Sequence, residues 1–235
     1  MRQKKKITVN GNVDLYAVVF NRTTETDLTE DQLPQVDIYK YKQVIFVGDS
    51  RTEFMENVLT GMGESATKNV KFVCSAGKGL DWFTTTGWAQ LYSIVQHDSN
   101  SILSKKTAVI FNFGVNDLSK SADYAEYYNW IAPQLKSKGC ELYFMSVNPV
   151  NRLMLPNAGR ADRSEAAVRS FNQYMKANLS SAYTYIDMYS YLKSTGYSFA
   201  SDHYGTGTVD DGLHYTTRTY KRIFAKCMDS LRVPA

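Results

Sequence analysis

A serine, an aspartate and a histidine in this chain have the types and spacing that nucleophilic acyl transfer requires. Ser50 ends a Gly-Asp-Ser segment that directly follows a short apolar run. Near the other end of the chain, Asp211 precedes His214 by three residues, and a glycine follows the aspartate directly. In such a set the imidazole takes the proton of the attacking hydroxyl, and the carboxylate fixes the tautomer and orientation of the ring. The three residues therefore predict an activated serine nucleophile.

Two further segments offer hydrogen-bond donors for the negative oxygen that forms when a hydroxyl attacks a carbonyl. Asn116 lies in a Gly-Val-Asn-Asp segment, and its carboxamide can donate two hydrogen bonds. Gly79 lies in a Gly-Lys-Gly segment, where the missing Cβ lets a backbone N–H approach a ligand closely. Gly77 of the same segment is the alternative. With the N–H of Ser50, these groups make a predicted oxyanion hole.

Each of these residues also has a purely structural interpretation, which the sequence alone leaves open. Ser50 fits a helix N-cap, because serine and aspartate are favoured caps. The pair of Asp211 and His214 fits a solvated cap of the helix that follows them. A turn that caps the next helix fits Asn116 and Asp117, and for Asp117 this is the favoured role.

The other two histidines are poorer candidates for the base. His97 lies near the end of a predicted helix, which favours a surface residue or a C-terminal cap. His203 directly follows an aspartate, and an adjacent carboxylate cannot easily fold back onto the ring of its neighbour. Asp210 is an alternative to Asp211 as the orienting carboxylate, with poorer geometry.

Alternating strands and helices are predicted to bring these segments to one edge of a sheet. Apolar runs predict strands at residues 44–47, 69–74, 107–113, 141–147 and 185–188. Helices are predicted at 51–62, near 88–96, and along apolar stripes within 124–135, 168–179 and 220–231. This alternation predicts a parallel sheet covered on both faces, whose ligands bind at the carboxyl ends of the strands. The segments that follow these ends contain Ser50, Gly79, Asn116 and Asn148.

The first 40 residues differ from the rest and are predicted to form an accessory segment. Residues 7–9 and 13–20 have the pattern of two strands joined by an Asn-Gly turn, and a polar loop follows at 21–34. Residues 41–235 are predicted to form one α/β domain. A chain of 235 residues suffices for such a domain with a substantial core.

Composition and charge narrow the range of partners. The chain is 43% hydrophobic and 21% charged, which is ordinary for a globular protein. The charge of four basic residues near the amino terminus equals the net charge of +4, so the charges of all other residues sum to zero. A basic tail, and not a nucleic-acid-binding face, is therefore predicted. No apolar run approaches the roughly 20 residues of a membrane span. An export signal requires a continuous apolar stretch after its basic start, and polar residues interrupt that stretch within 7–20. The sequence as given therefore predicts no export signal.

Neither a metal nor a cofactor is expected. The three cysteines are too few and too widely spaced for a disulfide framework or a structural zinc site: Cys74, Cys140 and Cys227. A metal phosphoesterase using Asp49, Asn116 and His214 is a remote alternative. Too few further histidines or paired carboxylates are present to hold two ions.

The four chemical segments, taken in order, resemble the SGNH or GDSL-like hydrolase family. The resemblance runs from about Gln43 to Leu231 and implies a three-layer α/β/α sandwich around a five-stranded parallel sheet, the flavodoxin-like arrangement. Two positions depart from the family pattern. The first segment reads Gly-Asp-Ser-Arg, without the leucine of the older family name, and the second has Cys74 where an asparagine is usual.

The resemblance implies a role for each residue and an activity for the whole. Ser50 is the nucleophile, His214 the base and Asp211 its orienting partner. Gly79 and Asn116 share the oxyanion hole with the N–H of Ser50. The implied activity is a metal-independent serine esterase that removes a short acyl group, with acetyl favoured, from a carbohydrate or small-molecule ester. The alternatives are an O-acyltransferase acting on a glycan with the same triad and a non-catalytic glycan-binding module. The resemblance also favours a secreted or cell-surface bacterial protein.

Three residues beside these segments are weaker candidates for substrate contact. Arg51 can contact an anionic or hydroxyl-rich substrate, although a surface position on the helix is favoured. Trp82 can stack on a sugar ring or pack in the core. Asn148 can contact substrate or cap a loop. The loop 151–163, which carries three arginines, can form a cleft wall or a solvated connection.

Overall fold

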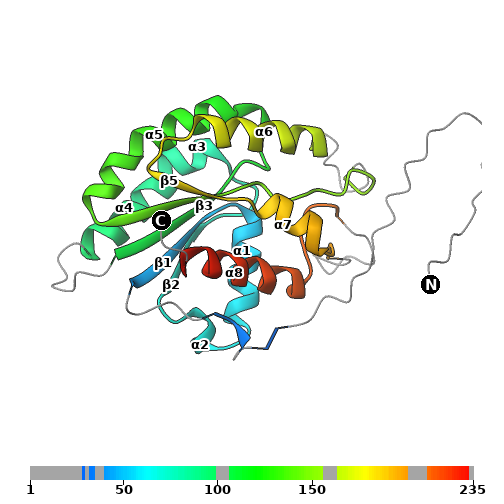
Figure 1. Ribbon diagram of the computed structural model, residues 1–235, viewed down its shortest axis with the longest axis horizontal. Helices are drawn as coiled ribbons and strands as arrows, with labels where there is room; N and C mark the ends of the chain where they lie inside the picture. The colour runs from blue at the N-terminus through cyan, green and yellow to red at the C-terminus, as the bar shows by residue number, and fades with distance from the viewer. Residues whose placement is uncertain are drawn as a thin grey trace, which may run out of the picture.

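Five parallel strands form the sheet at the centre of the computed structural model (Figure 1), which describes residues 28–29, 32–34, 40–98, 106–155, 163–200 and 211–232. The strands are β1 (Tyr41–Gly48), β2 (Val70–Cys74), β3 (Lys106–Asn112), β4 (Cys140–Met145) and β5 (Tyr183–Ile186). They lie in the order β2-β1-β3-β4-β5, and each neighbouring pair runs parallel. The strand order reverses between β1 and β3, so a ligand site is expected where these two strands end.

Helices connect the strands and cover both faces of the sheet. They are α1 (Ser50–Thr60), α2 (Glu64–Thr67), α3 (Leu80–Trp82), the π-helix η2 (Phe83–Gly87), α4 (Trp88–Asp98), the 3₁₀-helix η3 (Leu118–Lys120), α5 (Ser121–Ser137), α6 (Glu165–Asn178), α7 (Met188–Thr195) and α8 (Thr217–Arg232). The long helices coincide with the apolar stripes of the sequence. Pro133 is accommodated inside α5.

Two hydrophobic clusters, one on each face of the sheet, make three layers. Ile45 and Val47 of β1 pack in a cluster with residues of η2, α4, α5 and α6. Val44 and Phe46 of the same strand pack in a second cluster with residues of α1, α7 and α8. Successive strand residues point to opposite faces, which explains why a continuous apolar run serves both clusters. Figure 1 shows the helices on either side of the sheet. The predicted α/β/α sandwich with a five-stranded parallel sheet is confirmed.

Three strands end earlier than the sequence predicts: β3 at Asn112 and not at 113, β4 at Met145 and not at 147, and β5 at Ile186, where a helix follows. The last predicted strand covers 185–188, whereas β5 ends at Ile186 and α7 begins at Met188. Asp187 caps α7 by accepting a hydrogen bond from the Ser190 N–H at 3.0 Å. The short elements α2, α3 and η2 were not predicted either, since fewer than two turns give no measurable stripe.

The predicted amino-terminal hairpin lies outside the described residues. Of the accessory segment, Leu33 is buried in the cluster that α1 and α8 share, and Leu28 packs against the same cluster. Within the described ranges, no helix combines the length and the apolar character needed to cross a membrane.

Candidate active site

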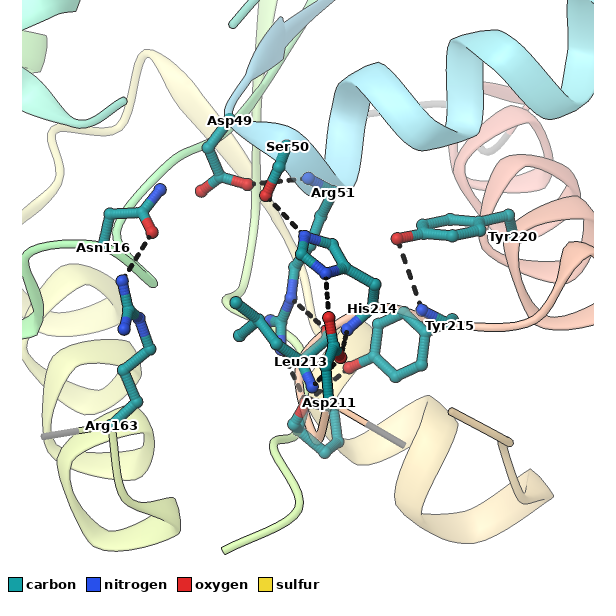
Figure 2. A network of polar contacts seen from close by, with 11 residues as sticks. Asp49, Ser50, Arg51, Asn116, Arg163, Asp211, Leu213, His214, Tyr215 and Tyr220 are labelled. Carbon is teal, nitrogen blue, oxygen red and sulfur yellow. Dashed lines mark hydrogen bonds and ion pairs between the residues drawn. The ribbon is translucent and has the colours of Figure 1, made fainter. Parts of the chain in front are cut away.

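The first turn of α1 presents Ser50 just beyond the carboxyl end of β1. Asp49 is the N-cap residue, and its Oδ1 accepts a hydrogen bond from the Arg51 N–H at 3.0 Å. Ser50 is therefore the first helical residue, so its hydroxyl is not the cap that one interpretation expects. Its Oγ lies 2.7 Å from His214 Nε2, and the contact is buried (Figure 2).

A tight turn before α8 joins the histidine to its carboxylate. Asp211 Oδ2 lies 2.5 Å from His214 Nδ1, while Oδ1 accepts hydrogen bonds from the Leu213 and His214 N–H groups, both at 2.8 Å. Gly212 has a φ of 69°, and a Cβ there would lie 2.6 Å from the Asn151 carbonyl oxygen. Asp211 and His214 are 6% and 1% exposed, so the interpretation as a solvated cap is wrong.

The Asp211 carboxylate is held in its charged form. Burial acts to raise the pKa of Asp211, but the hydrogen bond and charge of His214, together with two backbone N–H donors, lower it well below its ordinary value. An ionised carboxylate on Nδ1 leaves Nε2 of the ring directed at Ser50. The arrangement can therefore accept the serine proton and stabilise the imidazolium that results.

An aromatic residue that the sequence interpretation did not single out packs against the imidazole. The Phe54 ring lies edge-on to the His214 ring, with 4.7 Å between the ring centroids. Phe54 lies four residues after Ser50, and side chains four apart share one face of a helix. That spacing is the sequence signal that could have identified it.

The predicted oxyanion residue Asn116 lies across from Ser50 and is held on both sides of its carboxamide. Nδ2 donates to the Lys78 carbonyl oxygen at 2.8 Å, and Oδ1 accepts from Arg163 Nη2 at 3.0 Å. This bond uses one of the two amide hydrogens, and the second remains for a ligand. The contact also brings the loop that contains Gly79 to the loop that follows β3.

Asp117 has a different role from the helix cap that the sequence favours. It makes no side-chain capping bond to η3. Its Oδ2 accepts from the Leu80 N–H at 2.9 Å, and its Oδ1 accepts from the Tyr124 hydroxyl at 2.7 Å. A Cβ on Gly79 would lie 2.3 Å from Asp117 Oδ2, so glycine is required for this approach. At Gly77 a Cβ would meet nothing within 4 Å, but its φ of 70° favours glycine there as well, so the choice of Gly79 over Gly77 as the oxyanion donor stays a prediction.

Arg51 is buried and holds three loops together. It is 3% exposed, and its guanidinium donates from Nε to the Leu213 carbonyl at 3.0 Å, from Nη1 to the Asn148 carbonyl at 2.8 Å and from Nη2 to the Pro149 carbonyl at 2.9 Å. The guanidinium carbon also lies 5.2 Å from the centre of the Tyr215 ring. The burial of Arg51 contradicts a surface position on the helix, while contact of its side chain with a substrate stays a prediction.

The two other weaker candidates lie within or against the core. Trp82 is half-buried, and its ring lies 6.0 Å from that of Phe113 in the cluster under α4 and α5. Asn148 is buried, and its Oδ1 has no hydrogen-bond partner among the described residues. Contact of either side chain with a substrate stays a prediction.

Some predicted residues cannot be placed. Asp210, His203 and the central part of the loop 151–163 lie outside the described residues. His97 lies in α4, where only its backbone is described. At the described carboxyl-terminal end of the loop, the half-buried Arg163 contacts Asn116, and the role of the loop as a cleft wall or a solvated connection stays a prediction.

Asp49 makes a contribution to stability that depends on pH. Burial raises the pKa of its carboxyl to about 6 from an ordinary value of 3.8; the Asp117 charge adds to this, while Arg51 and Arg163 oppose it. A raised pKa means that the folded protein binds the proton more tightly than the unfolded chain. The contribution is therefore full below about pH 4 and is lost as the pH rises through about 6.

We expect Asp49→Asn to become progressively more stable than the wild type as the pH rises from about 4 to about 6. The amide keeps the capping oxygen but never carries the buried charge. Urea unfolding across this range measures the difference. Asp187→Asn is the matched control, because Asp187 is also an N-cap residue but is exposed. A constant difference between Asp49→Asn and the wild type would contradict the expectation.

The fold and this hydrogen-bonded set of side chains have the make-up of a serine hydrolase, a class in which the same set recurs on unrelated folds. The model of the GDSL-like lipase/acylhydrolase family matches residues 44–227. The chain therefore belongs to this family, whose members are in general serine esterases. No curated protein matches the chain in sequence.

Solved structures share the fold at low sequence identity. A protein assigned as an SGNH hydrolase from Slackia heliotrinireducens is 13% identical, with a TM-score of 0.54, over 82% of this chain and 100% of that one. A protein assigned as an acylhydrolase from Bacteroides fragilis is 16% identical, with a TM-score of 0.51, over 86% and 93% of the two chains. An acetyl xylan esterase is 13% identical, with a TM-score of 0.51, over 81% and 100%. At these identities the likeness is one of fold.

Proposed function

We propose that this protein is a metal-independent serine esterase that removes a short acyl group, acetyl in the first instance, from a carbohydrate or small-molecule alcohol. The observation that carries the proposal is the buried chain of contacts from Ser50 Oγ to His214 Nε2 at 2.7 Å and from His214 Nδ1 to Asp211 Oδ2 at 2.5 Å. Membership of the GDSL-like family supports ester bonds as the class of substrate.

The proposed reaction has two halves. His214 Nε2 takes the proton of Ser50 as Oγ attacks the ester carbonyl, and the oxygen that becomes negative is held by the N–H groups of Ser50 and Gly79 and by Asn116 Nδ2. His214 then returns the proton to the leaving alcohol as the carbon–oxygen bond breaks. In the second half, His214 takes a proton from water, which attacks the acyl-serine, and Ser50 recovers its proton as the acid leaves.

The acetyl preference rests on two supports. The sequence has no long apolar lid segment that would enclose a long acyl chain. An acetyl xylan esterase shares the fold, which makes acetylated carbohydrates the natural first substrates to examine. Chromogenic acetyl, butyryl and octanoyl esters, followed by a panel of acetylated glycans, test the preference. Faster turnover of the octanoyl ester than of the acetyl ester would contradict it. Formation of an acetylated sugar in place of free acetate would identify an acyltransferase.

Asn116→Ala is expected to lower kcat by about 100- to 1,000-fold with little change in KM, because one donor to the oxyanion is lost only in the transition state. Steady-state hydrolysis of a chromogenic acetyl ester measures both constants. Asn57→Ala is the matched control, since Asn57 is exposed on α1. An unchanged kcat in Asn116→Ala would remove this residue from the oxyanion hole.

A further inference from the structure

Arg163 reaches from the start of α6 to the loop that carries Asn116. It directly precedes Ser164, the N-cap residue of α6. Its half-buried side chain donates from Nε to the Val115 carbonyl oxygen at 2.9 Å and from Nη2 to Asn116 Oδ1 at 3.0 Å. The guanidinium thus binds two consecutive residues of one loop, the main chain of the first and the side chain of the second.

Together with the Lys78 carbonyl oxygen, which accepts from Nδ2 at 2.8 Å, the Arg163 contact fixes which end of the Asn116 carboxamide faces the serine. A guanidinium only donates hydrogen bonds, so the amide end that faces Arg163 must be the oxygen. Nδ2 must then point the other way. Figure 2 shows Oδ1 turned to Arg163 and Nδ2 turned to the side on which Asp49 and Ser50 lie. A carboxamide rotated by half a turn would present an acceptor to the developing oxyanion, which repels negative charge where attraction is required.

The positive charge of Arg163 also favours an oxyanion at this site. The buried Asp49 carboxyl lies beside the proposed oxyanion hole, and a second negative charge nearby is unfavourable. Arg163 is one of the positive groups that act electrostatically on Asp49. The guanidinium therefore also offsets the carboxylate beside which the oxyanion forms.

We propose that Arg163 is a positioning residue that fixes the orientation of the Asn116 carboxamide in the oxyanion hole. The proposal rests on the proposed esterase function, in which Asn116 donates to the oxyanion. Arg163 acts through Asn116 and does not itself contact the substrate. Its contribution should therefore depend on the presence of the amide.

The test compares Arg163→Met with the wild type in steady-state hydrolysis of a chromogenic acetyl ester. Loss of the guanidinium leaves the amide less well oriented but still present. We expect kcat to fall by about 10- to 50-fold, less than for loss of the donor itself, with KM changed by no more than about twofold. A rise in KM with kcat unchanged would indicate direct substrate contact and overturn the proposal.

A double-mutant cycle with Asn116→Ala makes the test specific. If Arg163 acts through the amide, Arg163→Met should lower kcat by less than about twofold in the Asn116→Ala background. The same 10- to 50-fold loss in both backgrounds would overturn the proposal. Arg163→Lys should recover part of kcat, because lysine keeps one donor and the charge.

Controls separate this proposal from folding and from the esterase function. Arg169→Met removes an exposed arginine from α6, the helix that Arg163 precedes, and should leave kcat unchanged. All constants are measured at a temperature at which circular dichroism shows each variant to be folded, which excludes unfolding as the cause of a lower kcat. Recovery of kcat in Arg163→Lys would show in addition that the positive donor itself is what matters. If Ser50→Ala abolishes turnover while the cycle is additive, only the role of Arg163 fails. If Ser50→Ala retains turnover, the esterase mechanism itself fails.

Discussion

Replacement of Ser50 by alanine is expected to lower kcat by at least about 10⁴-fold on any ester that the protein hydrolyses, because the attacking oxygen is removed. The fold should survive. Among the described residues the hydroxyl makes one side-chain hydrogen bond, to His214, and loss of one hydrogen bond lowers the free energy of unfolding by about 1 kcal/mol. Hydrolysis of a chromogenic acetyl ester, with thermal unfolding of the same sample, measures both effects.

Two controls give this result its meaning. His214→Ala should show a loss of similar size, because the residues of a triad act as a unit. A phosphonate that labels activated serines should modify the wild type at Ser50 and leave Ser50→Ala unlabelled. Wild-type turnover in Ser50→Ala, or a label on a different residue, would end the proposed mechanism. Labelling of Ser50 without turnover of any ester would support Ser50 as an activated nucleophile and would mean that the esters assayed are not its substrates.

The central strands and long helices could be predicted because local patterns record them. β1 is buried on both faces, so its apolar residues form a continuous run. β5 lies at the edge of the sheet and has half-exposed positions, so its pattern is weaker and its end was misplaced at Met188. α7 begins there with only eight residues, too few for a clear stripe.

The meeting of Ser50 with His214 could be predicted because the order of the four chemical segments resembles that of a known family. Parallel strands end at one edge, which places Ser50 there, but within the described residues His214 follows no strand directly and lies just before α8. The family resemblance is what predicted that these two residues, 164 positions apart, would meet. It also added the specific roles, which remain proposals here. The burial of Asp211 and His214 removes the solvated-cap interpretation that the sequence alone had to keep open.

The roles of Arg51, Asp117 and Arg163 could not be predicted, since their partners are distant main-chain groups or loops. Arginine and aspartate are ordinarily exposed, so composition gives no sign that a particular one is buried. Arg51 binds carbonyl groups 97, 98 and 162 positions away, and Asp117 binds an N–H group 37 positions away. Such pairings depend on how loops meet in space, which no spacing in the sequence records.

Arg51→Met should destabilise the protein by about 3 kcal/mol, although methionine fills much of the same volume. The Asn148 and Leu213 carbonyls lose a buried donor, and each such loss costs about 1 to 3 kcal/mol. The Pro149 carbonyl keeps the hydroxyl of Tyr215 as a partner, so its loss counts for less. Methionine also avoids the cost of burying the guanidinium charge, which offsets part of the expected destabilisation. For a chain of this size, thermal unfolding should shift down by about 6 to 12 °C.

Catalysis should fall as well, because Arg51 ties the first turn of α1 to the Leu213 carbonyl in the turn that carries the base. Without this tie, the contact of Ser50 with His214 depends on the remaining packing of that turn. At a low temperature where Arg51→Met is fully folded, its kcat should still lie below that of the wild type, and phosphonate labelling of Ser50 should be slower. Arg51→Lys should show intermediate stability, since an ammonium cannot reach three separate carbonyls. Arg169→Met provides the exposed control. Stability and labelling equal to the wild type in Arg51→Met would mean that the buried guanidinium is dispensable, and the positions of Ser50 and His214 would then have to be attributed to packing alone.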